Sequence, residues 1–319
     1  MIADEFGGRG DGNCFQPDIA VTSYELRATG ALLGLAIGDA LGAPVEFQRR
    51  GSFDLVTDMM SGGYFRLPAG AWTDDTAQAL CLANSLLENP DFSAGDFLDR
   101  LWGWMERGEN TSTGIAIGVG QNTLRVMGNY RRTGALLAPR MPGKSDGNGA
   151  LMRLAPVASM HWRDSVKACQ IASAQSRATH HSDLSAGCCE VLASVLSRII
   201  AGQSWDDAID LAPHNSWPDA VKDIALGTWR RKPVEDISST GFVVHTLEAA
   251  IWSVGTTDSF EAALVRAVNL GDDADTVGAV TGQIAGARYG AGAIPGRWLS
   301  SLAKADDLSR LAERLIAER

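Results

Sequence analysis

The stretch GALLGLAIGDALG, residues 30–42, places a glycine at every fourth position: Gly30, Gly34, Gly38 and Gly42. Steps of four keep residues on one face of an α-helix. Each glycine inside a helix costs about 1 kcal/mol relative to alanine. Close approach of another helix is the usual gain that offsets such a cost. The pattern therefore predicts a helix that lies with its backbone directly against a partner.

The predicted partner lies near the other end of the chain, where GAVTGQIAGARYG repeats the spacing with Gly278, Gly282, Gly286 and Gly290. Membrane helices that dimerise use similar stripes, but Asp39, Gln283 and Arg288 interrupt these two segments. The simplest arrangement packs the two helices into one central layer. Both ends of the chain then meet in a single domain over residues 26–319, which is preceded by an N-terminal extension of residues 1–25.

The remaining sequence is mostly helical in pattern. Apolar residues recur at helical spacing in DLSAGCCEVLASVLSRIIAG, TGFVVHTLEAAIWSV and SLAKADDLSRLAERLIAER. The best candidate for a strand is FDLVTDMM, residues 53–60, and its signal is weak. We therefore expect an all-α fold.

Composition excludes some classes of function. The net charge is −10, which argues against nucleic-acid binding through a basic surface. Five cysteines form no CxxC pair, which fits reduced thiols in the cytoplasm. The sequence shows neither an export signal nor a run long enough to span a bilayer, so we expect no membrane association.

Two acid-rich stretches, WTDDTAQAL at residues 72–80 and NLGDDADTVGAV at residues 269–280, stand just before apolar helices and contain no lysine or arginine. Either stretch alone is explained by acids in the first turn of a helix, with Thr73 as a cap for the first. Together they bring four carboxylates, and like charges that are buried together oppose folding. The carboxylates are Asp74, Asp75, Asp273 and Asp275.

Hard divalent cations would neutralise this cluster, because Mg²⁺ and Mn²⁺ bind carboxylate and hydroxyl oxygens. Thr73 and Thr276 would add neutral oxygens, and four carboxylates suit two cations better than one. Zinc is disfavoured because neither stretch contains histidine or cysteine.

Other motifs fit less well. PGKS at residues 142–145 lacks the first glycine of a phosphate-binding P-loop. DDADT lacks the glycine and the distal glutamate of an EF-hand. Prenyl-diphosphate enzymes also combine helices with two aspartate-rich segments, but they need DDxxD and Gln78 occupies the last position. That alternative stays open as the weaker one.

Five motifs together resemble the ADP-ribosylglycohydrolase family, in the family's order and from about residue 28 to residue 298. They are GALLGLAIGDALGAPVEF, WTDDTAQAL, DGNGALMRLAPVA, THHSD and GDDADTVGAVTGQIAGARYG. The resemblance implies a compact orthogonal multi-helix bundle with two Mg²⁺ or Mn²⁺ ions in a central cleft. It also implies an enzyme that hydrolyses the bond between ADP-ribose and a protein side chain.

The resemblance further implies roles for individual residues. The metal ligands would be Thr73, Asp74, Asp75, Asp273, Asp275 and Thr276. The catalytic carboxylates would be Glu46, which closes the GDALGxxxE motif, together with Asp74 and Asp75, either of which would help to deprotonate the attacking water. The substrate-binding residues would be Ser145, Asp146, Gly147 and Asn148 at the phosphates, and His180 near the ADP-ribose.

Gly118 marks a departure from the arginine-type members, in which an aspartate faces the acceptor at this place. TGIAIGVGQNT resembles the Gly-x-Gly of serine-type members instead. We expect an ADP-ribosylated protein as substrate, with arginine as the favoured acceptor and serine close behind. A non-catalytic member of the family remains a separate alternative.

Residues 1–25 combine glycines and acids with aromatic side chains. Aromatic residues suit a segment that docks in a cleft better than they suit a linker. We therefore expect that the segment is either a partner-binding arm, which would block a cognate ADP-ribosyltransferase and make the chain an immunity protein, or a plain terminal extension.

Overall fold

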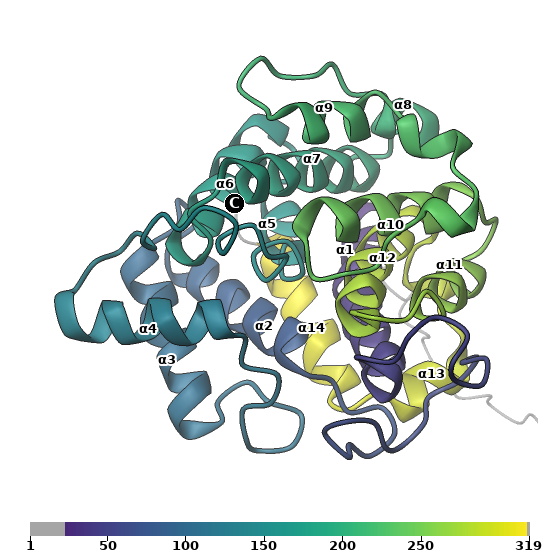
Figure 1. Cartoon of the computed structure of the whole chain (residues 1–319), viewed down its shortest axis with the longest axis horizontal. Coiled ribbons are helices and arrows are strands. Elements are labelled where there is room, and N and C mark those ends of the chain that lie inside the picture. The colour runs from purple at the N-terminus through teal and green to yellow at the C-terminus, as the bar shows by residue number, and fades with distance from the viewer. Residues whose placement is uncertain (1–22, 318–319) are drawn as a thin grey trace, which may run out of the picture.

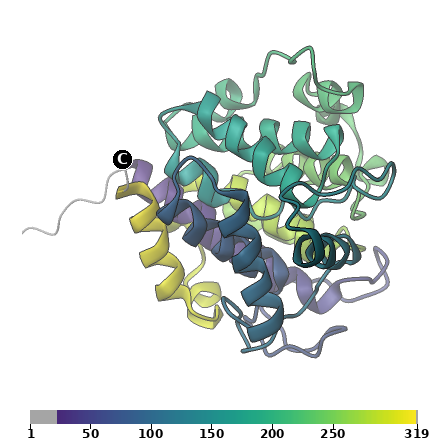
Figure 2. The same cartoon turned by 90° about the vertical axis from the view of Figure 1, so that its left-hand side faces the viewer.

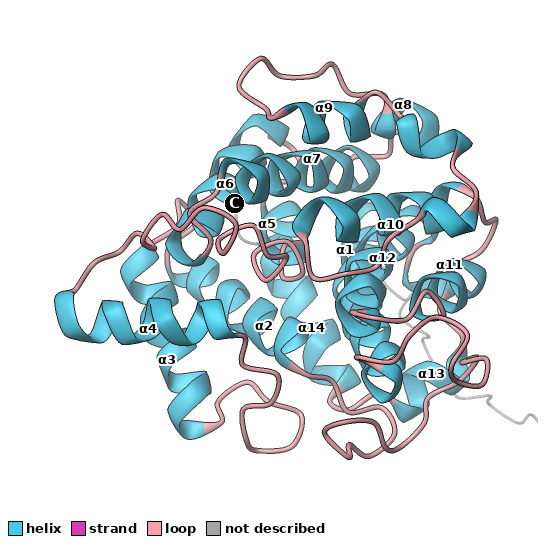
Figure 3. Cartoon of the chain, viewed as in Figure 1, coloured by secondary structure: helices cyan, strands magenta, loops and turns pink. Residues whose placement is uncertain are grey.

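Residues 23–317 are described by the computed structural model, and they form helices joined by loops (Figure 3). The α-helices are α1 (Ser23–Gly42), α2 (Asp74–Glu88), α3 (Ala94–Arg107), α4 (Gln121–Thr133), α5 (Ala155–Met160), α6 (Ser165–Thr179), α7 (Asp183–Ile200), α8 (Trp205–Ile209), α9 (Asp219–Ala225), α10 (Val243–Gly255), α11 (Phe260–Val268), α12 (Ala274–Tyr289), α13 (Gly296–Ser301) and α14 (Ala305–Ala317). Short 3₁₀ turns occupy Ala43–Val45, Thr228–Arg231, Val234–Asp236 and Ala291–Ala293. The all-α prediction is confirmed.

Helices α1 and α12 form the centre of the molecule and run antiparallel (Figure 1). Gly34 faces Gly282 and Gly38 faces Gly278, so closely that a Cβ atom added to Gly38 would lie 2.0 Å from the Gly278 carbonyl oxygen. Any side chain on these faces would force the backbones apart. The predicted close contact between the two glycine stripes is therefore confirmed.

The two stripes differ at their ends. Gly42 faces the first turn of α12, where an added Cβ would lie 2.4 Å from the Asp275 backbone nitrogen. Gly290 does not take part in the close contact. It ends α12 with a φ of 79°, a left-handed conformation that favours glycine. The stripe thus extends as far as the acid-rich start of α12 and stops short of its far end.

The other helices surround this pair. Helices α10 and α11 pack against α12, and α6 packs along α7. The last helix, α14, packs beside α1 (Figure 2), so the beginning and the end of the described chain lie together. Almost all of α1 is buried as a result.

Two local expectations change. The segment of residues 53–60 is a loop rather than a strand, because most of its side chains are exposed and it finds no neighbouring strand in the described chain. Helix α1 begins at Ser23, so the last three residues of the expected extension belong to the first helix. Tyr24 stacks on Trp162 with ring centroids 4.6 Å apart. Residues 1–22, which carry the rest of the expected arm, lie outside the described residues.

The expectation that no run is long enough to span a bilayer is wrong by length and composition, because Ser23–Val45 is long and apolar enough to cross a membrane. Its most apolar window is 94 % buried within the protein. The apolar character of this stretch is thus accounted for by its place in the core, against α12.

Candidate functional site

The two acid-rich stretches meet in a cleft of about 270 Å³ at one end of the central helix pair. Helix α2 begins with the first stretch and α12 with the second, and both beginnings point into the cleft. The lining includes Glu46, Asp74, Asp273 and Asp275. Acids that lie about 200 positions apart in the sequence thus share one small space.

The carboxylates form two overlapping groups. The first triad is Asp39, Asp75 and Asp275, and the second triad is Glu46, Asp273 and Asp275. In each triad the three carboxylate oxygens lie within 4.8 Å of one another. Asp275 belongs to both, so its carboxylate lies between two adjacent groups of oxygen atoms.

Asp39 was not among the residues predicted for the site. It lies on α1 and is fully buried. Its Oδ1 accepts hydrogen bonds from the Thr73 backbone N–H at 2.9 Å and hydroxyl at 2.8 Å, and its Oδ2 accepts from the Thr76 backbone N–H at 3.0 Å and hydroxyl at 2.7 Å. Asp39 thus caps α2 from a neighbouring helix. The sequence signal was a lone carboxylate inside a glycine-striped apolar helix.

Thr73 occupies the cap position of α2, but its side chain does not cap the helix as predicted. It donates its hydroxyl proton to Asp39 instead. The lone pairs of the hydroxyl oxygen are then free to bind a cation. Thr276, in the first turn of α12, is also buried and lines the cleft.

Asp74 lines the cleft but belongs to neither triad. Its Oδ2 accepts a hydrogen bond from Gln78 Nε2 at 3.3 Å. On its other side lies Gly118, where an added Cβ would be 2.1 Å from Asp74 Oδ1. Gly118 has a φ of 79°, a conformation that favours glycine, and a side chain at this position would displace the Asp74 carboxylate. Gly118 therefore contacts a carboxylate of the cleft, and its position has no space for a side chain that could contact the acceptor residue.

Burial and mutual repulsion raise the pKa values of these carboxyl groups in the metal-free protein. Burial, followed by the charges of neighbouring carboxylates, raises the pKa of Asp75 and Asp275 well above the usual range. Burial, with the charge of Asp273 next, raises the pKa of Glu46 to about 8. No arginine or lysine lines this cleft in the described chain. The described lining thus offers no lysine or arginine to balance the charge of these carboxylates.

Two oxygens in the cluster lack any partner. Asp75 Oδ1 and Glu46 Oε2 are buried and accept no hydrogen bond from the described residues. A buried acceptor without a partner costs about 1–3 kcal/mol. Oxygen-only ligands and unpartnered carboxylate oxygens are what Mg²⁺ or Mn²⁺ requires. The residues present therefore fit a divalent metal centre.

Glu46 follows the 3₁₀ turn Ala43–Val45 at the end of α1, and its loop is tied to the start of α12. Phe47 N–H donates to the Asp272 carbonyl oxygen at 2.7 Å, and Asp272 N–H donates to the Gln48 carbonyl oxygen at 2.7 Å. The Asp272 side chain is exposed, which agrees with its exclusion from the predicted ligands. This backbone pairing holds Glu46 in place beside Asp273 and Asp275, the other members of the second triad.

The predicted phosphate loop, residues 145–148, lies beside the acids, but part of it is engaged elsewhere. Ser145 N–H donates to the Met141 carbonyl at 3.0 Å, and Asn148 N–H donates to the Gly241 carbonyl at 3.1 Å. Asn148 Nδ2 donates to Asp273 Oδ2 at 2.6 Å. Asn148 thus orients a carboxylate of the second triad. The side chain of Asp146 accepts from the Ser182 hydroxyl.

Only Gly147, of the four loop residues, combines an open backbone N–H with a place in the cleft lining. Its N–H makes no backbone hydrogen bond within the described chain. Its Cα lies against the ring of His180, where an added Cβ would be 3.6 Å from Nε2. The loop would therefore present fewer backbone donors to a phosphate than its sequence suggested.

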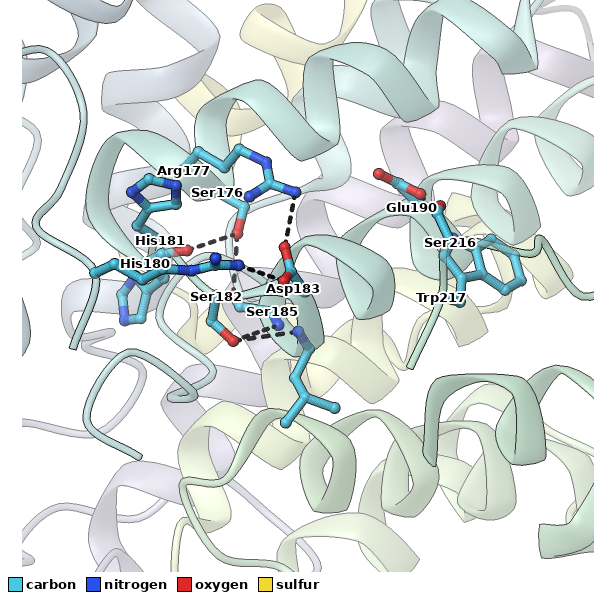
Figure 4. A network of polar contacts seen from close by, with 12 residues as sticks. Ser176, Arg177, His180, His181, Ser182, Asp183, Ser185, Glu190, Ser216 and Trp217 are labelled. Atoms are coloured by element: carbon cyan, nitrogen blue, oxygen red, sulfur yellow. Dashed lines mark hydrogen bonds and ion pairs between the residues drawn. The ribbon is translucent and has the colours of Figure 1, made fainter. Parts of the chain in front are cut away.

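His180 ends α6 and lines the cleft, and its backbone is held by the turn that leads into α7. Its N–H donates to the Ser176 carbonyl at 2.6 Å, and its carbonyl accepts from the Ser176 hydroxyl at 3.4 Å and from the Ser182 N–H at 2.8 Å. Figure 4 shows this turn, with Ser176, His180 and Ser182 close together. Burial, with the charge of Arg153 next, lowers the pKa of His180 to about 3, so the ring is neutral at ordinary pH.

Comparison with known proteins agrees with this geometry. The sequence profile described as ADP-ribosylglycohydrolase matches residues 20–319. The chain belongs to the ADP-ribosylglycohydrolase family. It is 41 % identical over 290 residues to ADP-ribosylarginine hydrolase Tri1 of Serratia proteamaculans (strain 568), covering 91 % of this chain and 78 % of that protein. It is 33 % identical over 280 residues to ADP-ribosyl-[dinitrogen reductase] glycohydrolase of Rhodospirillum rubrum, covering 86 % and 90 %.

A solved structure of the ADP-ribosylglycohydrolase family gives the same result. The structure titled "ADP-ribosylglycohydrolase-related protein complex" superposes with a TM-score of 0.82 at 40 % sequence identity. The match covers 93 % of this chain and 99 % of the other. The resemblance seen in the sequence motifs is thus confirmed for the family and for the fold.

Proposed function

We propose that this chain is an ADP-ribosyl-protein hydrolase that uses two divalent cations, Mg²⁺ or Mn²⁺. The observation that carries the proposal is the pair of triads joined at Asp275, in a cleft with no lysine or arginine among its described lining. The unpartnered oxygens of Asp75 and Glu46 support it. The names of relatives at 41 % and 39 % identity support the chemistry, since both are called ADP-ribosylarginine hydrolases.

The ligand set follows from which oxygens are free. Both oxygens of Asp39 already accept two hydrogen bonds each, so Asp39 positions α2 rather than binding a cation. One cation would then be held by Thr73, Asp75 and Asp275. The other would be held by Asp273, Asp275 and Thr276, with Glu46 above it. When bound, the cations supply positive charge that orients the ribose hydroxyls and lowers the pKa of water.

Asp74 is the best placed proton acceptor among the described residues. It faces the cleft outside both triads, so a ligand role does not occupy it. The Gln78 amide donates to its Oδ2, and Oδ1 remains available to take a proton from the attacking water. The reaction breaks the bond between the anomeric carbon and the side-chain atom of the acceptor. The developing oxocarbenium charge is stabilised by the surrounding carboxylates.

We propose arginine as the acceptor, on the names of the two relatives at about 40 % identity. Peptides carrying ADP-ribosyl-arginine or ADP-ribosyl-serine, incubated with the protein in Mg²⁺ or in EDTA, test the whole proposal. We expect free ADP-ribose from the arginine peptide in Mg²⁺ only. Asp74→Asn should abolish release and retain the rise in melting temperature that Mg²⁺ causes. Release in EDTA, or from the serine peptide alone, would contradict the proposal.

We further propose that the protein acts in the cytoplasm as an immunity protein, and that residues 1–22 bind an ADP-ribosyltransferase independently of the cleft. This segment combines Phe6 and Phe15 with the acids Asp4, Glu5 and Asp11, as a docking arm would. Four cysteines of the described chain are free thiols, which fits the cytoplasm. Deleting residues 1–22 should abolish transferase binding and spare hydrolysis, and Asp75→Asn should do the reverse. Unchanged binding by the truncated protein would refute the role of the segment.

A further inference from the structure

Arg153 is buried behind the lining of the cleft, in the segment that joins the phosphate loop to α5. Its guanidinium is fully shielded from solvent and lies over the ring of Phe97, 4.7 Å from the centroid. Its four hydrogen bonds all end on uncharged oxygens, and within residues 23–317 no carboxylate pairs with it directly. Burying a cation without an anionic partner costs free energy of folding, so its presence beside the cleft points to a functional role.

One of these bonds, from Arg153 to Thr179, determines the tautomer of His180. Arg153 Nη2 donates to Thr179 Oγ1 at 2.6 Å, and Thr179 Oγ1 lies 2.9 Å from His180 Nδ1. A guanidinium can only donate. The Thr179 hydroxyl, which is fully buried, therefore accepts from Arg153 and has its own proton left for His180 Nδ1. With Nδ1 as the acceptor, a neutral imidazole carries its proton on Nε2.

The Nε2 atom of His180 is the one that faces the cleft. It lies beside the glycines of the phosphate loop, 3.1 Å from a Cβ added to Gly149, and it has no partner among the described residues. In the opposite tautomer, the Thr179 proton would be buried without an acceptor and the cleft would meet a bare nitrogen lone pair. The arrangement thus turns His180 into a neutral hydrogen-bond donor that points into the cleft.

A second bond, from Arg153 to Gln78, determines the orientation of the Gln78 side-chain amide. Arg153 Nη1 donates to Gln78 Oε1 at 2.7 Å. The amide nitrogen must then lie on the other side, where it donates to Asp74 Oδ2. A flipped amide would set two donors against each other at Arg153 and two acceptors against each other at Asp74. The remaining two bonds of Arg153 go to Gln175, which in turn donates to the Ala150 carbonyl at 2.9 Å.

We propose that Arg153 is a positioning residue: its fixed donors set the tautomer of His180, which then presents an N–H to the cleft, and the amide orientation of Gln78, which then directs an N–H to Asp74. The inference rests on the proposed function, because the His180 donor serves an anionic or hydroxyl-rich ligand such as ADP-ribose and the Gln78 donor orients the proposed proton acceptor. The buried positive charge of Arg153 also opposes protonation of His180, which keeps the ring a single donor.

The wild-type protein gives the first test. A ¹⁵N spectrum of the histidine rings distinguishes the two tautomers, and the His180 signals among the five histidines are assigned from their loss in His180→Gln. We expect the proton on Nε2. A proton on Nδ1 in the wild-type protein would overturn the proposal, whatever the activity of any variant.

The second test removes one hydroxyl. Thr179→Val keeps the shape of the side chain but leaves His180 Nδ1 without a donor, so the ring should populate the Nδ1–H tautomer. The dissociation constant for ADP-ribose in Mg²⁺ should then rise roughly ten-fold, the effect of one hydrogen bond. Thr179→Ser should restore both readouts. Thr281→Val is the matched control, since Thr281 is equally buried and bonds only within its own helix, to the Val277 carbonyl at 2.7 Å.

A third variant separates charge from geometry. Arg153→Lys keeps the positive charge but replaces the two fixed nitrogens that donate to Thr179 and Gln78 by a single ammonium on a flexible stem, which does not hold both acceptors in place. It should change the His180 spectrum as Thr179→Val does. If Arg153→Lys does not fold, the His180 spectra of the wild-type protein and of Thr179→Val still test the proposal. An unchanged spectrum and an unchanged dissociation constant in Thr179→Val would refute the positioning role. The expected wild-type spectrum without any ADP-ribose binding would instead contradict the proposed function.

Discussion

Replacing Gly282 by alanine should destabilise the protein, although alanine is the better helix former. An added Cβ would lie 1.9 Å from the Gly34 carbonyl oxygen and 2.4 Å from its carbonyl carbon. Both are backbone atoms and cannot rotate away. Helices α1 and α12 must therefore separate by about 1 Å, and a gap of that size forfeits up to roughly half of each dispersion contact along the interface.

The magnitude follows from two opposing effects. Overpacking against rigid neighbours costs about 3 kcal/mol, the upper end of the usual range. The gain in helix propensity returns about 1 kcal/mol. The free energy of unfolding should therefore fall by about 2 kcal/mol or more. Urea denaturation followed by circular dichroism measures this quantity if the transition is two-state.

The matched control is Gly128→Ala in α4. Gly128 is helical too, but an added Cβ would meet no atom within 4 Å. There the same substitution should stabilise by up to about 1 kcal/mol, because only the propensity changes. Equal stability of the two variants, or a stabilised Gly282→Ala, would show that the glycine stripe does not depend on close packing.

Three further predictions concern the acids. Asp75→Asn should stabilise the metal-free protein in thermal melts, because one of several repelling charges is removed, and should abolish the rise in melting temperature caused by Mg²⁺. In EDTA, stability should fall as the pH rises from about 4.5 to about 8, because folding raises the pKa of Glu46 across that window and the folded state binds the extra proton. Melts at pH 5 and pH 8 check this, and greater stability at pH 8 would contradict it. Gly118→Ala should lower turnover by displacing Asp74 but keep the Mg²⁺-induced rise, and equal turnover in Gly118→Ala and its unobstructed neighbour Gly120→Ala would refute the contact.

The central helix pair was predictable from the sequence, because glycines at every fourth position of a helix indicate that another backbone packs directly against that face. The meeting of the two acid stretches was predictable for a related reason, since uncompensated charges at two helix starts need a common partner. Asp39 escaped prediction because its role depends on where α2 begins in space. Periodicity gives which face of a helix is buried, and it does not say which carboxylate caps a neighbour.

The hydrogen bonds of Arg153 behind the cleft were not predictable from the sequence either. Arg153 sits in an apolar run, MRLAPVA, and nothing local indicates that it bonds to residues on two other helices. The backbone of the predicted phosphate loop depends on the same kind of contact. A distant segment around Gly241 accepts a hydrogen bond from the Asn148 N–H of this loop. Long-range hydrogen bonds of this kind leave no periodic trace in the sequence.

The contact between Gly42 and the first turn of α12 has a consequence for folding during synthesis on the ribosome. Roughly 230 residues separate Gly42 from Asp275, and at about 5–20 residues per second a ribosome needs roughly 10–50 s to synthesise them. Throughout that interval α1 is an apolar helix without its partner, and the metal cleft has only half of its wall. The nascent chain is therefore inactive and in need of chaperone protection until its last quarter emerges.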